Sequence, residues 1–283
     1  MTTKTIEPEL AKAATSFEYF LFHHVLIRDV LPDGSTRVIQ FQHWPMHDEA
    51  LSDLKNESRL VVLKARQVSL SWLVDSWIAW NMLFTEGFKA GMTSAGETEA
   101  TEFLDKCRFI FTHLPYETPV ILDPDNSLEI AVNGRSLMGF PSTPKAGRGF
   151  NYNIFVADEA AFHPYAQEAY ESYEAATEYG QIIIVSSAEN ENRQVTNDFF
   201  QRLWQGAPGN GFKARFYPWS ARPGRDAEWY EVRAARLSGR PGAMQRNYPS
   251  TPEEAFRSML SLYFDADALE QGKQGCTLPR TSV

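Results

Sequence analysis

The segment 61–72 constrains the fold of this chain more than any other feature. It begins as an apolar strand, continues through a short loop that carries Lys64 and Ser71, and ends in the apolar start of a helix. A strand, a loop and a helix in this order surround a phosphate with backbone N–H groups and a helix N-terminus. The usual phosphate-loop pattern, G-x-x-x-x-G-K-S/T, is not met, because Leu70 stands at its Lys position and Ser69 at its second Gly. Alone, the segment therefore indicates a nucleotide site only weakly.

The composition is that of a protein with a large core and no membrane span. Hydrophobic residues make up 43% of the 283 residues, enough for one α/β domain with appendages or for two smaller units. The longest apolar-rich stretch, 72–84, is too short and too polar to cross a bilayer, and the N-terminus lacks a secretory signal pattern. Only Cys107 and Cys276 are present, which excludes a disulfide scaffold and a cysteine-based zinc site. We expect an intracellular protein.

The net charge argues against a protein that works mainly by wrapping nucleic acid. The chain carries 36 acidic and 27 basic residues, a formal charge of −9, whereas such proteins are usually basic. Any contact with nucleic acid must therefore be local, or be supplied by an assembly of several chains.

From residue 59 onward, apolar strands alternate with helical segments. This alternation predicts an α/β fold with a mostly parallel central sheet and helices on both faces. A short helix at 16–24 and two strands around a turn at 32–34 indicate an N-terminal arm. The segments expected in the rest of the chain are strands at 60–64, 88–93, 153–157, 181–185 and 213–219, helices at 71–84, 98–113, 164–178 (with Pro164 in its first turn), 196–204, 226–238 and 242–247, a hairpin at Asn133-Gly134, and a C-terminal tail.

Two adjacent carboxylates, Asp158 and Glu159, follow the apolar strand 153–157. In phosphate-loop ATPases, one carboxylate at a strand end holds Mg²⁺ and a neighbouring one orients or deprotonates the attacking water. The alternative is that the two residues merely cap the helix expected near Pro164. The carboxylates alone leave both interpretations open.

Two further segments carry polar groups that suit the same chemistry. Ser186 and Ser187 follow the strand 181–185, and the Gly-flanked loop 142–149 carries Lys145 and Arg148. Each has an ordinary alternative, a strand ending in one case and a solvated surface loop in the other. Ligands gather at the carboxyl ends of parallel strands, so three polar strand ends in one α/β segment together favour a binding site.

The order of these motifs resembles the ATPase domain of the large terminase subunit, the DNA-packaging motor of tailed bacteriophages. The resemblance rests on segments 64–72, 141–149, 155–162 and 183–188, with 248–256 and 263–265 closing the domain. It implies a phosphate-loop ATPase fold of the additional-strand type. It also implies three parts, which are an N-terminal arm with an adenine-recognition segment (1–58), an ATPase core (59–220) and a C-terminal lid or linker region (221–283).

The resemblance assigns roles residue by residue. The loop would be a variant Walker A motif with its functional Lys at the front, and a Mg²⁺ ion would lie between Ser71 and Asp158, the Walker B carboxylate. Glu159 would be the catalytic base and Arg148 a finger that acts on a neighbouring subunit. The segment 41–47 resembles the adenine-recognition segment, where the family usually has Gln in place of His47. The remaining residues expected to bind ATP or to couple its hydrolysis to movement are Lys64, Ala65, Arg66, Gln67, Val68, Ser69, Leu70, Gln42 and His47 for binding, and Ser186 and Ser187 for coupling.

The resemblance further implies partners and a location. These are double-stranded DNA, a portal protein and procapsid, a small terminase subunit, and other copies of the chain in a ring, in the cytoplasm of the host cell; in isolation the chain could be a monomer. Only 18 residues follow Asp265, so we expect no nuclease domain and no DNA cleavage. Two alternatives remain, a helicase-like ATPase that depends on nucleic acid and a non-hydrolysing assembly module.

Overall fold

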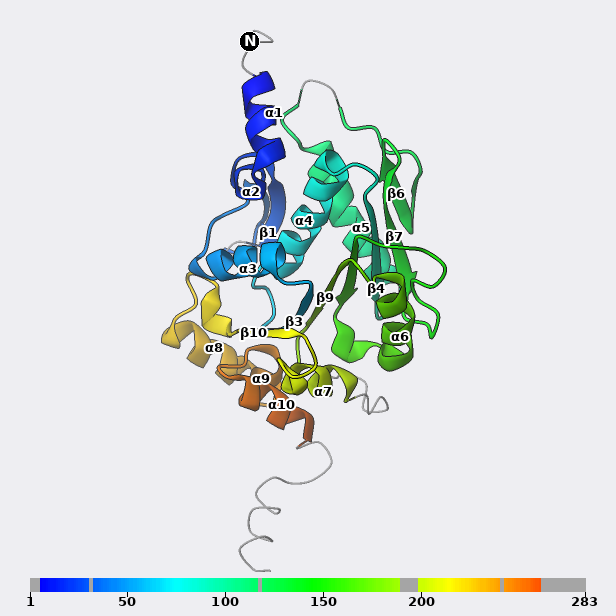
Figure 1. Cartoon of the computed structure of the whole chain (residues 1–283). Coiled ribbons are helices and arrows are strands. Elements are labelled where there is room, and N and C mark those ends of the chain that lie inside the picture. The colour runs from blue at the N-terminus through cyan, green and yellow to red at the C-terminus, as the bar shows by residue number, and fades with distance from the viewer. Residues whose placement is uncertain (1–5, 31–32, 117–118, 189–197, 240–241, 261–283) are drawn as a thin grey trace, which may run out of the picture.

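The computed structural model describes residues 6–30, 33–116, 119–188, 198–239 and 242–260. Its centre is an eight-stranded sheet in the spatial order β10-β3-β9-β8-β4-β7-β6-β5 (Figure 1). The first six strands pair in parallel, whereas β6 and β5 each run antiparallel to their neighbour. The predicted mostly parallel sheet is therefore confirmed. The strands are β3 (Arg59–Lys64), β4 (Lys89–Ser94), β5 (Asp125–Asn126), β6 (Glu129–Val132), β7 (Arg135–Pro141), β8 (Ile154–Asp158), β9 (Gln181–Ser186) and β10 (Lys213–Tyr217).

The central strands are mainly apolar in their middle residues because helices cover the sheet on both faces. Side chains alternate along β3, with Val62 joining one buried cluster and Val61 and Leu63 the other. The first cluster includes α4 (Leu70–Phe84) and α5 (Glu97–Thr112), and the second includes α6 (Ala166–Ala176) and α7 (Phe199–Gly206). These two clusters are the core that fixes the sheet between its helical layers.

The position of β9 determines which strand ends meet. In the chain β4 follows β3, yet β9 and β8 lie between them in the sheet. In register, Leu63 of β3 is opposite Ser186 of β9, and Val185 of β9 is opposite Asp158 of β8. A strand inserted between the loop-bearing strand and the carboxylate-bearing strand is the arrangement that the additional-strand prediction requires. It brings the carboxyl ends of β3, β9 and β8 side by side.

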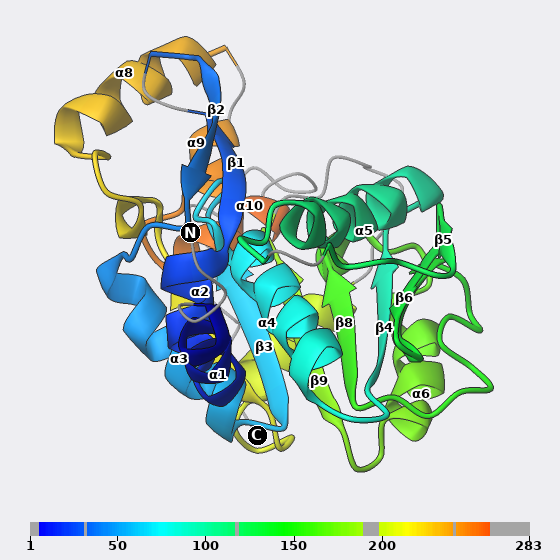
Figure 2. The ribbon, with the colours of Figure 1, turned by 90° about the horizontal axis from the view of Figure 1, so that it is seen from above.

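The N-terminal region packs against the same core. It comprises α1 (Ile6–Thr15), α2 (Phe17–His24), the hairpin of β1 (Leu26–Val30) and β2 (Thr36–Gln40), and α3 (Pro45–Asn56). Phe20 and Leu21 of α2 are fully buried in the cluster that holds Leu73 of α4. The helix and hairpin predicted here are confirmed, and α1 and α3 are helices that were not predicted. Figure 2 shows the hairpin extending beside α8 (Ala227–Leu237).

The predicted tail is wrong for residues 252–260, which form the helix α10 (Pro252–Leu260). Proline suits a first helical turn, and Glu253 and Glu254 lie where carboxylates favour a helix N-terminus. The backbone N–H of Glu254 donates to the hydroxyl of Thr251. The rest of the tail, the resembling segment 263–265 and residues 196–197 of a predicted helix lie outside the described residues. The predicted helices near 226–238 and 242–247 are α8 and α9 (Ala243–Asn247).

Two local predictions have opposite outcomes. The hairpin turn is confirmed, because Asn133 and Gly134 both have positive φ angles, 50° and 76°. The placement of Pro164 in a first helical turn is wrong, since α6 begins at Ala166 and a 3-10 turn (Ala160–Phe162) occupies the space after β8. Consequently Asp158 and Glu159 do not cap that helix.

Of the helices that the structure describes, none has the length and apolar character needed to cross a lipid bilayer.

We predict that Gly91→Ala lowers the free energy of unfolding by about 1–3 kcal/mol, the usual cost of overpacking a core. A Cβ atom on Gly91 of β4 would lie 2.6 Å from the ring of Phe155 and 2.9 Å from that of Tyr152. Denaturant unfolding measures the effect. The control is Gly239→Ala, where an added Cβ meets no atom within 4 Å. Equal stabilities of the two variants would contradict the packing described for β4.

Candidate functional site

The loop between β3 and α4 reverses direction through two residues in left-handed conformations. Gln67 has a φ of 59° and Ser69 a φ of 58°. Side chains with a Cβ pay about 1 kcal/mol or more for this conformation, which glycine adopts freely. Ser69 is the residue that precedes the first turn of α4, and its side chain makes no capping hydrogen bond. Its backbone thus has the geometry that the missing glycine would provide, at a cost in strain.

Lys64 and Leu70, whose order in the loop departs from the usual pattern, have different surroundings. Leu70 lies among apolar side chains, and Lys64 lies beside a carboxylate. Leu70 is 4% exposed and packs in the core, so its side chain is part of the hydrophobic interior. Lys64 is also buried, at 6% exposed, but its ammonium meets the carboxylate of Glu159 with 2.8 Å between Nζ and Oε1. The cationic group of this loop therefore comes from the end of β3, and it points toward the end of β8.

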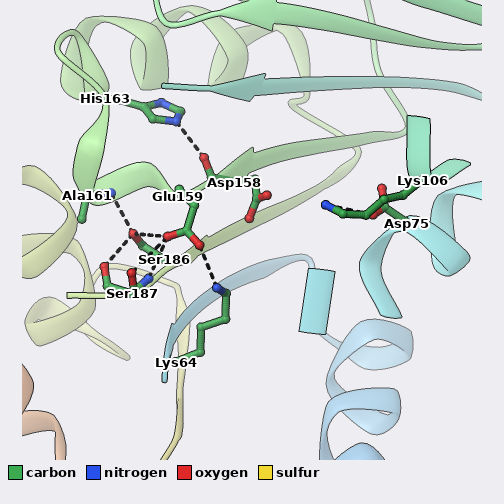
Figure 3. Close-up of polar contacts among 9 residues, drawn as sticks. All are labelled: Lys64, Asp75, Lys106, Asp158, Glu159, Ala161, His163, Ser186 and Ser187. Atoms are coloured by element: carbon green, nitrogen blue, oxygen red, sulfur yellow. Dashed lines mark hydrogen bonds and ion pairs between the residues drawn. The ribbon is translucent and has the colours of Figure 1, made fainter. Parts of the chain in front are cut away.

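Glu159 is the centre of a polar network formed by the three strand ends (Figure 3). Its Oε1 accepts from Lys64, and its Oε2 accepts from the backbone N–H of Ser187 at 3.1 Å and from the Ser187 hydroxyl at 3.3 Å. The Ser186 hydroxyl accepts from the N–H of Ala161 at 3.0 Å and lies 3.5 Å from Oε2. The structure thus brings together four predicted site residues from three separate strands.

The environment shifts the pKa values of the two adjacent carboxylates, Asp158 and Glu159, in opposite directions. Burial favours the neutral form of Glu159, but the charge and hydrogen bond of Lys64 and the N–H of Ser187 outweigh it and lower its pKa to about 2. Burial and the neighbouring charge of Glu159 raise the pKa of Asp158. Glu159 also has a left-handed backbone, with φ 51° and ψ 44°. Such strain in a non-glycine residue is typical of functional sites.

Asp158 and Ser71 carry oxygen atoms that could bind a metal ion, and both lie at the carboxyl edge of the sheet. Asp158 ends β8, and Ser71 lies in the first turn of α4. The imidazole of buried His163 donates from Nε2 to the backbone carbonyl of Asp158 at 2.8 Å and so fixes the strand end; burial lowers the pKa of His163 to about 4. One carboxylate and one hydroxyl fit Mg²⁺, which takes few protein oxygens and keeps several waters. No group of three or more His, Cys, Asp or Glu side chains suited to a metal occurs among the residues described.

The two residues expected to contact a base lie in different environments. Gln42 is exposed, and its side-chain amide donates to the carbonyl of Gln40. His47 is 0% exposed, accepts from the N–H of Trp44 through Nδ1 at 3.0 Å, and stacks on the Trp44 ring. Burial lowers the pKa of His47 to about 4. His47 therefore stabilises the start of α3, and its position gives no support to a direct contact with a base.

Among the described residues, Arg148 makes no hydrogen bond to Glu159, whose partners are Lys64, Ser186 and Ser187. Its side chain is exposed, on a loop where Gly147 and Gly149 have φ angles of 75° and 94°. Gly147 packs so closely that a Cβ there would lie 2.6 Å from Phe155. The loop base is thus anchored in the core while the guanidinium is accessible to another molecule.

Arg222 and Arg225 donate hydrogen bonds to the backbone of the loop between β3 and α4. The sequence analysis did not predict this role. Arg222 donates to the carbonyl of Gln67 at 3.1 Å, and Arg225 to that of Arg66 at 2.9 Å. The N–H of Arg66 in turn donates to the carbonyl of Asn247. Nothing in the local sequence marks these arginines, which follow the loop by more than 150 positions. Asp75 and Lys106, also missed, lie on the other side of Asp158 (Figure 3).

We predict that Ser69→Gly raises the free energy of unfolding by up to about 1 kcal/mol, because glycine removes the left-handed strain. Denaturant unfolding of the variant and of Ser69→Ala, which keeps the strain, isolates the effect. A Gly variant less stable than the Ala variant would show that this backbone conformation is not strained.

No protein-family model matches the chain, and a search of curated proteins finds no match. Among solved structures, the ATPase domain of the Thermus phage P74-26 large terminase has a TM-score of 0.47 and 16% identity, over 68% of this chain and 88% of that one. The large terminase of a thermophilic bacteriophage in complex with ATP-gamma-S has a TM-score of 0.49 and 8% identity, over 68% of this chain and 49% of that one. The Phi-28 gp11 DNA packaging motor has a TM-score of 0.40 and 11% identity, over 72% and 67%. At these values the likeness alone carries no functional conclusion.

Proposed function

We propose that this chain is an ATP-hydrolysing motor domain of the kind found in the large terminase subunit, which drives double-stranded DNA into a procapsid. The observation that carries the proposal is the meeting of Lys64, Glu159 and Ser187 at the adjoining carboxyl ends of β3, β8 and β9. Lys64 is the cation, Glu159 the candidate base and Ser187 the candidate coupling residue. They lie together beside the loop that leads into α4. The order of the sequence motifs supports the same assignment.

The loop residues 64–71 bind the phosphates of ATP in this proposal. The N–H groups at the start of α4 and the ammonium of Lys64 provide the positive potential that phosphate oxygens need. Lys64 is paired with Glu159 in this structure, so the phosphates and Glu159 compete for one ammonium. Nucleotide binding then draws Lys64 away from the carboxylate.

Glu159 becomes a better base when Lys64 leaves it. The pKa of about 2 results from the charge and hydrogen bond of Lys64, the backbone N–H of Ser187 and the charge of Arg66, which act against burial. Loss of the Lys64 contact leaves burial to raise that pKa, and a carboxylate with a higher pKa takes a proton from water more readily. Binding of ATP and activation of the base are thereby linked through one side chain.

Ser71 and Asp158 would hold Mg²⁺, which supplies charge neutralisation for the phosphates when bound. The carbonyl of Asp158 is fixed by His163, so the strand end keeps its position while the site changes charge. Ser187 donates twice to Glu159, so a change at this carboxylate is passed to the end of β9. That link is the proposed start of the coupling between hydrolysis and movement.

The further expectations form part of the same proposal. The net charge of −9 makes a local DNA-contacting surface, repeated around a ring of copies, more suitable than one wrapped by a single chain. The portal, procapsid and small terminase subunit would be the other partners, in the host cytoplasm. The division at residues 58 and 220 belongs to the proposal as well.

We predict that Glu159→Gln keeps ATP binding and lowers hydrolysis by about 10²–10⁴-fold, the usual effect of removing a general base. Calorimetry with ATP and Mg²⁺ measures binding, and phosphate release measures hydrolysis. The matched control, Glu168→Gln on the exposed face of α6, should behave as wild type. Near-normal turnover by Glu159→Gln would remove that residue from the role of base. If the wild-type chain bound no ATP at millimolar concentration, a non-hydrolysing assembly module would be favoured.

We predict that Arg148 acts on the site of a neighbouring copy. Arg148→Ala and Glu159→Gln should each abolish the hydrolysis of an assembled ring, whereas a mixture of the two should regain part of it. In the mixture some interfaces combine an intact Arg148 with an intact Glu159 from different copies. Lys145→Ala, an exposed residue of the same loop, should keep its activity. A mixture as inactive as either variant alone would exclude action between copies.

A further inference from the structure

Asp75 and Lys106 lie together behind the proposed metal ligands, and burial raises the pKa of Asp75. Asp75 is on α4, one helical turn after Ser71, and its side chain is 0% exposed. Its Oδ2 accepts no hydrogen bond among the described residues, and Oδ1 lies 3.6 Å from the thiol of Cys107. The ammonium of Lys106, on α5, lies 3.9 Å from Oδ2. A carboxylate this deep in the protein is costly unless a cation compensates it.

Lys106 extends toward Asp158 as well as toward Asp75. Figure 3 shows its ammonium directed to the Asp158 carboxylate, with Asp75 beside it. Its side chain is 29% exposed. Burial alone would lower the pKa of Lys106, but the charges of Asp75 and Asp158 outweigh it and raise that pKa. The ammonium therefore remains charged between a carboxylate on α4 and a carboxylate on β8.

A divalent cation at Asp158 would meet this ammonium as a like charge. Like charges a few ångströms apart near a protein surface repel one another, because the effective dielectric constant there, about 20, is well below that of water. Lys106 thus stabilises the Asp158 carboxylate in the absence of metal and opposes a metal that arrives there. Asp75, which cannot move out of α4, holds the ammonium in this place.

We propose that Lys106 is a positioning residue for the divalent-metal position at Asp158, an internal cation with which the metal must compete. The inference rests on the proposed function in one respect, that Asp158 receives the metal. Neither the loop motif nor the carboxylate pair in the sequence points to Lys106. The result would be a site that stays electrostatically balanced when empty and that accepts Mg²⁺ most readily together with the negative charge of a nucleotide.

The test measures the affinity of the full chain for Mn²⁺ in the absence of nucleotide. The electron paramagnetic resonance signal of free Mn²⁺ reports how much of the ion is bound. Lys106→Met removes the competing charge and should tighten binding by about tenfold. Lys106→Arg should bind as wild type, because a cation is restored. Asp75→Asn/Lys106→Met, which leaves no unpaired buried charge, should also bind more tightly and serves if Lys106→Met does not fold. Lys89→Met, an exposed site at the start of β4, is the control.

The outcomes separate this inference from the proposed function. Unchanged or weaker Mn²⁺ binding in Asp75→Asn/Lys106→Met would overturn the role of Lys106 and leave a purely structural ion pair. Asp158→Asn should lose Mn²⁺ binding in every background. If it does not, the metal position at Asp158, and with it part of the proposed function, is wrong whatever Lys106 does.

Discussion

The parallel pairing of β9 between β3 and β8 is the constraint on which the rest of the site depends. It fixes Leu63 opposite Ser186 and Val185 opposite Asp158, so that three strand ends distant in the chain become neighbours. Strands in this position must be apolar on both faces, and the two helical layers then leave only the carboxyl edge for polar groups. The contact between Lys64 and Glu159 follows directly from that geometry.

Acidic and basic side chains lie close together along this edge. Lys64 compensates Glu159, and Lys106 compensates Asp75 and Asp158. Each lysine has a competing partner in the proposed reaction, the phosphates for Lys64 and the metal for Lys106. Substrate and metal would therefore rearrange existing ion pairs instead of filling a neutral cavity.

The sequence predicted the strands and their polar ends because strands buried on both faces stand out as apolar runs. It therefore located Lys64, Glu159 and Ser187 correctly on the edge that the structure assembles, though their roles remain proposals. It could not show that Lys106 is directed toward Asp158, because that placement depends on how α5 packs against its neighbours. It also could not show that His47 turns inward, since burial of a helix-capping histidine is decided by tertiary packing. Ser69 stands where the usual phosphate-loop pattern has glycine, and its φ of 58° lies in the left-handed region that glycine favours.

We propose above all that the ammonium of Lys64 leaves the Glu159 carboxylate and binds the phosphates of ATP. A crystal structure with a non-hydrolysable ATP analogue and Mg²⁺ tests this most directly. We expect Lys64 Nζ to contact the β- and γ-phosphates and to lie beyond hydrogen-bonding distance of Glu159, from which it is 2.8 Å away in the present structure. We also expect the metal between Ser71 and Asp158. A bound analogue with the pair of Lys64 and Glu159 unbroken, or an analogue held away from the loop, would contradict the account.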